Sequence, residues 1–548
     1  MDEKVKAVHT VIVPVGAPSG KDDGRSLAST DLDAELLAAL GYKQQFRRAF
    51  RPIELFGVVF SLICIVPGLS SVLVYSLPNG GPVAMVWGWV VVSGFSVCVT
   101  LALAELASAA PTSGGLYYWT HRFASPRWRN LLAWLVGYAN TLAYITMMSA
   151  GNWALALMVS AAVSIGTDMA WNPTTAQLYG VSCALIISEA TMSSVATKVI
   201  ARAQWVYITF NILLFLAVII ALPISTPREL INRPAYVFGH FENSSGWRDG
   251  VAFLLSFLSP LFATGGYDAP IHVSEEASNA NVMVPRAMVI AICMASIIGW
   301  ATVIALVFCM GTDIAGIVGS PIGQPMAVIM FNSFGKKGVL AVWSILAITF
   351  YMAATSLLTV ASRQCFAFAR DGALPVSGLL YRINPFTHTP VNCVWFVCAI
   401  AMLVSLLAFA GSAAISALFT MAIASLYITY IIPIATRFVF KNDFKPGPFS
   451  LGRLSFPIAA TSVLWMLFVV VMLLFPTSPN PSAATMNYAV VVTGGVLALS
   501  TMYFYLPVYG GRYWFTGPKR NIDFDEGTQS GALCEDKLTT STMTNTRT

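Results

Sequence analysis

The stretch VAFLLSFLSPLFATGGYDAPIHVSEEA, residues 251–277, is long enough to cross a bilayer but carries residues that interrupt a helix halfway. Gly265 and Gly266, followed closely by Asp268, disfavour a continuous helix. Backbone amides and carbonyls freed at bilayer depth are tolerated only where protein or a water-filled cavity receives them. We therefore predict a break near Thr264 to Tyr267 that lines a binding site.

Asp268 strengthens this hypothesis, because an ionisable residue inside a spanning segment is a candidate functional group. It is equally well placed to cap the second half of the helix, with Pro270 in the first turn. Both roles, helix cap and direct ligand, stay open and can coexist.

The composition indicates an integral membrane protein. Hydrophobic residues make up 57% of the chain and charged residues only 10%, against about 25% in soluble domains. The net charge of +6 is modest and bears on membrane topology rather than on nucleic acid, so no nucleic-acid partner is expected. The cysteines form no CxxC motif, and we predict no metal site, no cofactor and no disulfide framework.

The fold class predicted is an all-α membrane protein with about twelve transmembrane helices. The expected spans are residues 53–76, 82–109, 131–163, 178–193, 203–224, 251–277, 287–310, 339–361, 391–410, 412–436, 457–475 and 487–506. A cytoplasmic tail is expected over 1–50, with LLAALGYKQQFRRAF as a short amphipathic helix, ahead of a transporter domain over 51–508 and a disordered tail over 509–548.

Positive charges concentrate on one set of alternating loops, while the other set holds only Arg228, Arg233, Arg248, Lys336 and Lys337. The positive-inside rule therefore places both termini in the cytoplasm. Asn243, in the sequence Asn-Ser-Ser, then lies in an outward loop as a glycosylation candidate, although the tripeptide is a weak motif.

The first span repeats the irregularity of the sixth. Residues Pro67, Gly68, Ser70 and Ser71 lie at its centre and predict a second break. An offset of five spans is typical of inverted repeats that meet at a midplane site. Amides around Gly68 to Ser71 would suit a carboxylate, and carbonyls around residues 263–265 would suit an ammonium. Close helix packing is the alternative explanation of the glycines.

Other polar residues within spans are candidates for gating or coupling. Glu105, near the end of the second span, could join a proton network, but an interfacial, hydrated position is favoured, and Glu189 in the fourth span is interpreted in the same way. His272 and Glu275 are expected to line an inner vestibule or to pair with loop arginines. Phosphate-loop, HExxH and nucleophile-elbow motifs are absent from the sequence, so we predict a gradient-driven transporter and not an enzyme.

The run AELASAAPTSGGLYYWTHRFASPRWRNLLAWLVGYAN, residues 104–140, resembles the amino acid, polyamine and organocation permeases. Together with GGPVAMVWGW, GGYDAPIHVSEEA, SRQCFAFARDGALP and MNYAVVV, it is similar to the fungal branch of GABA, amino acid and choline permeases, closest to GABA-permease-like members. The resemblance implies a five-plus-five inverted repeat, over about 52–224 and 250–436, with two extra helices over 457–506. It also implies an amino acid or related amine bound between the first, third, sixth, eighth and tenth spans.

The site residues implied by the resemblance, or placed from position in these spans, are Pro67, Gly68, Leu69, Ser70, Ser71, Asn140, Tyr144, Ala263, Thr264, Gly265, Gly266, Tyr267, Asp268, Tyr351 and Thr355. The first break reads PGLSS where bacterial relatives have a glycine-serine-glycine pattern. Some proton-coupled relatives have a lysine in the fifth span, where this chain has Asn211, so their coupling mechanism does not transfer.

The sequence favours a secondary transporter that imports a small zwitterion, with protons as the expected coupling ion and the plasma membrane as the expected location. A polyamine site would be expected to show several carboxylates, and only Asp268 qualifies. The alternatives are a choline or polyamine permease and a non-transporting amino acid sensor on the same scaffold. A channel is disfavoured because the breaks carry no rings of charge.

Overall fold

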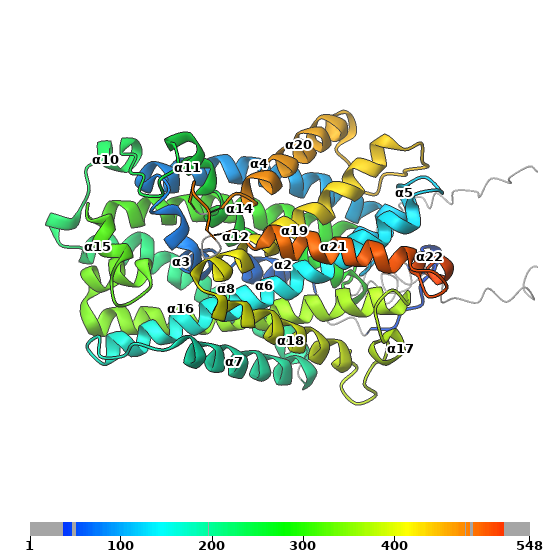
Figure 1. Ribbon diagram of the computed structural model, residues 1–548, viewed down its shortest axis with the longest axis horizontal. Helices are drawn as coiled ribbons and strands as arrows, with labels where there is room; N and C mark the ends of the chain where they lie inside the picture. Colours follow the sequence, from blue (N-terminus) through cyan, green and yellow to red (C-terminus); the bar gives the residue numbers. More distant parts are fainter. Residues whose placement is uncertain (1–36, 47–50, 196, 477, 483–485, 520–548) are drawn as a thin grey trace, which may run out of the picture.

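The computed structural model describes residues 37–46, 51–195, 197–476, 478–482 and 486–519. This part of the chain folds into a bundle of helices whose axes run along the long dimension of the molecule (Figure 1). Strand pairing within it is limited to an isolated bridge between Asn79 and Asn243. The arrangement confirms the predicted all-α class.

Ten helices in the described residues are long and apolar enough to cross a membrane. They are Pro52–Ser76 (α2, Pro52–Ile63, and α3, Ile65–Ser76), Gly81–Ala109 (α4), Arg129–Gly166 (α6), Thr175–Val195 (α7), Val199–Ser225 (mainly α8, Thr197–Leu216), Ala280–Cys309 (α14), Pro325–Arg370 (α16), Val391–Ala410 (mainly α18, Val391–Ser405), Ser412–Val439 (α19) and Gly452–Leu473 (mainly α20, Ser455–Leu473). Two shorter apolar segments, Asp249–Ala263 (α11, Asp249–Leu255, and α12, Leu258–Ala263) and Ala489–Tyr505 (α21), complete the twelve predicted spans.

Burial separates the inner helices from the outer ones. The most apolar part of the first span is 89% buried, whereas that of the fifth span is only 22% buried. A helix that is apolar all round must be covered by protein or by lipid. The first span therefore lies in the centre of the bundle, and the fifth presents most of its surface to the membrane.

Spans five places apart in the chain pack against each other. The first contacts the sixth (α3 and α12), the second the seventh (α4 and α14), the third the eighth (α6 and α16), and the fourth the ninth (α7 and α18). This pairing is the one expected when two five-helix repeats interlock around a common centre.

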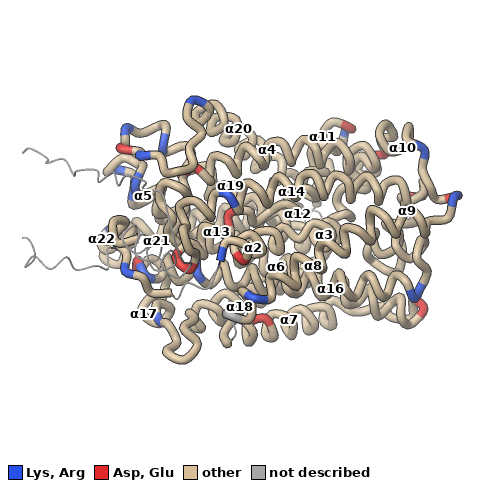
Figure 2. Tube along the Cα trace, turned by 180° about the vertical axis from the view of Figure 1, so that it is seen from behind, with Lys and Arg blue, Asp and Glu red and all other residues tan. Residues whose placement is uncertain are grey.

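The two ends of the bundle differ in charge. Lys and Arg gather at the end that carries α5 (Gly115–Phe123), α17 (Ser377–Leu380) and α22 (Gly511–Trp514), which we call the basic end (Figure 2). The opposite end carries α10 (Pro234–Gly239) and α15 (Ile314–Val318) (Figure 1). The first and last described segments both contact the basic end, through Gln44 and Lys519.

Several predicted boundaries differ from the structure. The eighth span was expected over 339–361, but α16 covers 46 residues because it includes a preceding helix joined across a non-helical Gly335. The amphipathic helix predicted before the first span is helical only over 37–39, since Gly41 has a φ of 94°. Of the tail predicted to be disordered over 509–548, residues 509–519 are described and include α22, which corrects the start of that tail. Residues 47–50 and 520–548 lie outside the described residues.

Candidate functional site

The first span is interrupted at Cys64, which has a φ of 39° between α2 and α3. The break was expected over Pro67 to Ser71, and its position is therefore corrected by a few residues. Pro67 lies in the first turn of α3, where its missing N–H is harmless. The amide of Gly68 is not free either, because it donates to the Cys64 carbonyl at 2.6 Å. The amides without an intrahelical acceptor are those of the preceding first-turn residues, Ile65 and Val66.

The remaining first-span candidates are buried and lie on α3. Leu69 packs in the core, and the hydroxyls of Ser70 and Ser71 donate to carbonyls of their own helix, those of Pro67 and Gly68, each at 2.7 Å. These hydroxyls satisfy local carbonyls, so the polar groups that the break frees belong to the main chain.

The sixth span breaks where the sequence predicts. Helix α12 ends at Ala263, and the chain resumes helical geometry only in α13 (Ala269–His272), which leads to a short 3-10 turn, η3 (Ser274–Glu276). Gly266 has a φ of 89°, a left-handed conformation that favours glycine. Asp268 occupies the N-cap position of α13 but makes no side-chain capping bond, which leaves its carboxylate for other contacts.

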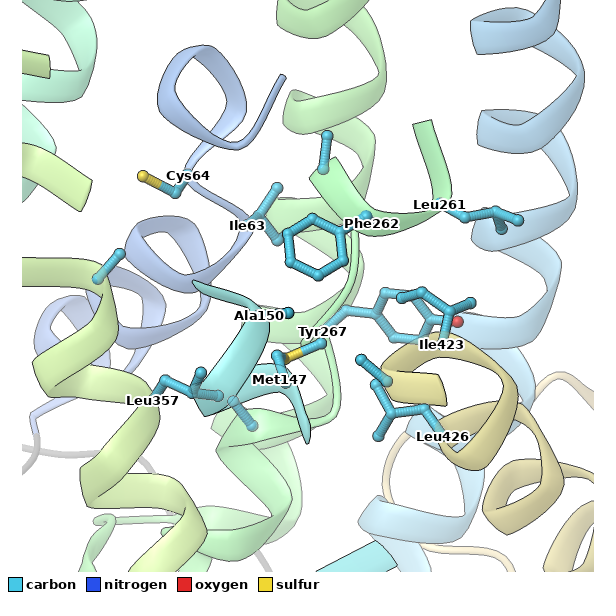
Figure 3. Packing of buried hydrophobic residues seen from close by; sticks show 14 of the residues in the cluster. Ile63, Cys64, Met147, Ala150, Leu261, Phe262, Tyr267, Leu357, Ile423 and Leu426 are labelled. Carbon is cyan, nitrogen blue, oxygen red and sulfur yellow. The ribbon is translucent and has the colours of Figure 1, made fainter. Parts of the chain in front are cut away.

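The two breaks lie side by side. A Cβ added to Gly68 would lie 3.4 Å from the Ala263 Cα, so a glycine at this position allows the two backbones to approach closely. Phe262 lies between the first break, marked by Ile63 and Cys64, and the Tyr267 ring (Figure 3). The free amides of one half-helix and the terminal carbonyls of another therefore come together in the centre of the bundle.

A cavity of about 40 Å³ lies against both breaks. A single buried water needs about 10–15 Å³ on a comparable measure, so this space suits a small molecule. Its described lining residues come from the first, third, sixth and eighth spans and carry no polar side chain: Leu62, Met147, Gly151, Phe262, Gly265, Phe350, Ala353, Ala354 and Leu357. Polar recognition of a bound molecule would fall to the main chain of the breaks.

A second cavity, of about 70 Å³, lies nearer the opposite end and is lined by Tyr75, Asn79, Ser416, Thr420, Asn487 and neighbouring apolar residues. A row of aromatic rings separates the two cavities. The Phe419 ring is 4.8 Å from the Phe262 ring, which lines the first cavity, and 5.6 Å from the Tyr75 ring, which lines the second.

Ion pairs close the route from the central cavity to the basic end. Arg370 holds both carboxylate oxygens of Glu275, at 3.1 and 3.2 Å, and Arg363 donates to Glu276 at 2.7 Å. The prediction left open an inner vestibule or pairing with loop arginines, and the arginines that pair with these acids lie in α16 and not in a loop. The Tyr42 ring lies 3.9 Å from the Arg370 guanidinium and covers this layer from outside.

Asp371 lies beside these ion pairs, and together with Glu275, Glu276, Arg363 and Arg370 it forms what we call the closed layer. Its carboxylate accepts hydrogen bonds from the Tyr117 hydroxyl at 2.7 Å and from the Lys519 amide at 3.0 Å. Burial raises the pKa of Asp371 to about 6, while the Arg370 charge and the Tyr117 hydrogen bond act in the opposite direction. Segments near both ends of the described chain are thus tied to the closed layer.

Four of the predicted polar residues form one buried cluster next to the sixth-span break. The Tyr144 hydroxyl donates to Asp268 Oδ2 at 3.0 Å, and His272 lies 3.6 Å from the same oxygen and 3.3 Å from the Asn140 amide. The Tyr267 ring packs against Tyr430 at 5.7 Å. None of these side chains is among the described residues that line the central cavity.

Glu105 and Glu189 correct the prediction that they are interfacial and hydrated. Glu105 is buried, and its carboxylate accepts hydrogen bonds from Arg437 and from the Ser455 hydroxyl, each at 2.6 Å. Glu189 is fully buried and accepts a 3.0 Å hydrogen bond from Asn152. Both carboxylates join helices of the bundle, and neither is among the described residues that line the central cavity.

In the fifth span, the bridging polar residue is Gln204, which the sequence prediction missed. It accepts from Ser61 of α2 at 2.9 Å and donates to Ser356 of α16 at 3.1 Å, and so links the first and eighth spans. Asn211 instead bonds the Tyr207 carbonyl of its own helix. The signal that could have identified Gln204 is an uncharged amide side chain within a predicted span whose other side chains are mostly apolar.

The eighth-span candidates face different surroundings. The Tyr351 hydroxyl is 2.9 Å from Ser188 of α7, on the outer side of the helix. Thr355 is buried, follows the cavity residue Ala354, and donates to the Tyr351 carbonyl. Thr264 likewise bonds its own helix, at Pro260.

Asn243 lies in the loop between α10 and α11 at the opposite end. Its amide nitrogen donates to the Trp247 carbonyl and to Asp249. Among the described residues, no cluster of three or more His, Cys, Asp or Glu side chains could hold a metal ion.

Comparison with known proteins agrees with this architecture. Residues 51–496 match the amino acid permease family model. An uncharacterized amino-acid permease of Schizosaccharomyces pombe is 40% identical over 487 residues, which cover 89% of this chain and 88% of that protein. The GABA-specific permease of Saccharomyces cerevisiae is 34% identical over 504 residues, covering 91% and 88% of the two chains.

A plant relative shares the similarity. An amino-acid permease of Arabidopsis thaliana is 30% identical over 504 residues, which cover 89% of this chain and 96% of the plant protein. The matched family model covers almost all of the spans described above, including both breaks. This chain therefore belongs to the amino acid permease family and is a multi-pass membrane transporter of amino acids.

Proposed function

We propose that the protein carries a small amino acid or GABA-like zwitterion across the membrane by alternating access. The observation that carries this proposal is the meeting of two broken spans beside a small cavity lined by apolar side chains. The first-turn amides of α3 at Ile65 and Val66 suit the carboxylate of such a substrate. The terminal carbonyls of α12 suit its ammonium group.

The size of the cavity and the chemistry of its wall favour a zwitterion over a polyamine. A polycation held in a low-dielectric site needs carboxylates that line it, and the described lining residues include none. A compact zwitterion with an apolar centre fits main-chain groups at its two ends and side-chain carbon between them. The GABA-specific permease among the relatives agrees with this substrate class.

Choline is a second candidate. The rings of Phe262 and Phe350 both line the cavity, and aromatic faces attract quaternary ammonium groups. Choline has no carboxylate, so it would leave the first-turn amides of α3 without a charged partner.

We further propose that the basic end faces the cytoplasm, in line with the positive-inside rule, and that the protein resides in the plasma membrane. The ion pairs at the basic end then close the cytoplasmic side, and the aromatic row of Tyr75, Phe262 and Phe419 gates the outer side. Import follows when these two closures open in turn, with protons supplying the driving gradient.

Purified protein in liposomes tests the substrate class directly. Labelled GABA uptake is measured against unlabelled GABA, proline, choline and spermidine at equal concentrations. We expect GABA and proline to compete. Competition by spermidine alone would rule out the zwitterion, and competition by choline alone would favour the second candidate. Saturable binding of GABA without any flux would instead indicate a sensor.

A further inference from the structure

A buried carboxylate and a buried imidazole lie one helical turn from the central cavity, toward the basic end. Asp268 and His272 are both fully buried, with 3.6 Å between Asp268 Oδ2 and His272 Nε2. Tyr144, which holds Asp268, precedes the cavity residue Met147 by one turn of α6. The pair therefore sits behind the cavity wall, where it can respond to a substrate without being its main ligand.

The hydrogen bonds around His272 fit the ring with one proton or with two. Nδ1 lies 2.9 Å from the Ser113 carbonyl oxygen, which can only accept, so Nδ1 carries a proton. Nε2 lies 3.3 Å from the side-chain amide of Asn140. The nitrogen of this amide can donate to a bare Nε2, and its oxygen can accept from a protonated one.

The same cluster can accommodate one more proton. Asn140 Oδ1 is buried without a hydrogen-bond partner, which is costly for a polar atom in a low-dielectric interior. A proton added to Nε2 turns it into a donor. It can then close on Asp268 Oδ2, and Asn140 can turn its amide to offer Oδ1.

The arginines packed near the pair already have acidic partners. From α16, Arg363 and Arg370 are engaged by Glu276 and Glu275. From α6 and α19, the phenols of Tyr144 and Tyr430 face Asp268. Helices α2 and α14 also pack against α13, but no ion pair given for the described residues joins either helix to Asp268 or His272. His272 is thus the basic side chain that lies against Asp268, at 3.6 Å.

The main chain of one residue, Ser113, connects the pair with the closed layer at the basic end. The Ser113 carbonyl accepts from His272, and the Ser113 amide donates to Glu275 Oε1 at 3.0 Å. Glu275 in turn holds Arg370. The short segment of α13 and η3 carries both His272 and Glu275, so a shift of His272 toward Asp268 moves the acid that closes the basic end.

We infer that the Asp268–His272 pair is the binding site for the proton that is transported with the amino acid. This inference rests on the proposed function and names its coupling site. The proton binds at Nε2 and leaves from the same atom, with no change in the bonds of the substrate. Loading brings imidazolium and carboxylate together, and unloading restores the arrangement described here.

Reconstituted vesicles test the inference with two readouts. The first is accumulation of labelled substrate under an inward proton gradient, together with dye-reported proton influx. The second is counterflow, the exchange of labelled for unlabelled substrate without a gradient, which needs no net proton movement. We expect His272→Gln to lower the ratio of gradient-driven accumulation to counterflow by about tenfold or more relative to wild type. Asp268→Asn should act in the same direction.

His121→Gln is the matched control, because His121 is also a histidine beside an asparagine, Asn130 at 3.1 Å, but it lies in α5 and away from the pair. It should retain the wild-type ratio. Proton-coupled accumulation by His272→Gln would overturn the inference. The wild type gives a readout that does not depend on the folding of any variant: counterflow without substrate-linked proton influx overturns the inference alone. Absence of all counterflow in the wild type overturns the proposed function as well.

Discussion

Gly266 holds the sixth span in a conformation that side chains rarely adopt, with a φ of 89°. A Cβ there costs about 1–2 kcal/mol of backbone strain, and a branched chain would also press on Leu62, 3.6 Å from the added atom. We expect Gly266→Leu to abolish uptake while the protein still reaches the membrane. Uptake per molecule of surface protein is the measurement.

Gly180 supplies the control for that substitution. It lies in α7 with open space around its Cα and an ordinary helical backbone. Gly180→Leu should transport at close to the wild-type rate. Normal uptake by Gly266→Leu would mean that the left-handed glycine is not needed for the transport cycle.

Asp371 gives a pH dependence with a definite sign. Burial raises its pKa to about 6 from an ordinary value of 3.8, so the folded protein binds this proton more tightly than the unfolded chain. Ionisation of Asp371 therefore lowers the free energy of unfolding, by its full amount above about pH 6. This loss shrinks as the pH falls from about 6 towards 3.8. Compared with Asp371→Asn, the wild type should gain melting temperature between about pH 7.5 and pH 5. A constant difference between the two proteins across this range would contradict the shifted pKa.

The η3 turn and the end of α16 are held together by a buried ion pair, Glu275 with Arg370. Removing one partner strands the other charge in the interior, at a cost of about 3–5 kcal/mol. We expect Arg370→Gln to lower the melting temperature and transport strongly. Addition of Glu275→Gln should restore much of the stability, because the stranded carboxylate is then gone. A double mutant no more stable than Arg370→Gln would show that the two residues act independently.

The elements predicted from sequence were those with local signals. Hydropathy located the twelve spans, and Gly265-Gly266 located the sixth break because glycine at that point releases the helix. Cys64 carries no such signal, since a cysteine among apolar residues is consistent with unbroken helix, and the first break was therefore placed too late. Glu105 was predicted to be hydrated because the sequence does not reveal its partner, Arg437, which lies 332 residues away along the chain. Contacts of that separation depend on how the helices pack, as does the bridge made by Gln204.

At the scale of the whole molecule, charge separates the two ends of the bundle (Figure 2). Ser244, between α10 and α11, is exposed at the opposite end. Asp443, between α19 and α20, is exposed at the basic end, where the preceding Asn442 donates to the Phe123 carbonyl. With the basic end in the cytoplasm, an impermeant maleimide should label Ser244→Cys on intact cells. It should label Asp443→Cys only after permeabilisation.

The wild type, whose own cysteines lie mostly in the spans, gives the background for this labelling. Labelling of Asp443→Cys on intact cells, with Ser244→Cys protected, would invert the proposed orientation. It would also exchange the roles of the two gates, since the ion-paired layer would then face outward.

The apolar wall of the central cavity has a consequence for how such carriers diversify. If main-chain groups hold the charged ends of a nutrient, changes at Met147, Phe350 or Leu357 alter only the room between those ends. After gene duplication, a few substitutions in the cavity wall can therefore change the substrate of one copy while the broken spans and gates stay the same. Carriers that descend from one ancestor can then transport different but related nutrients by the same mechanism.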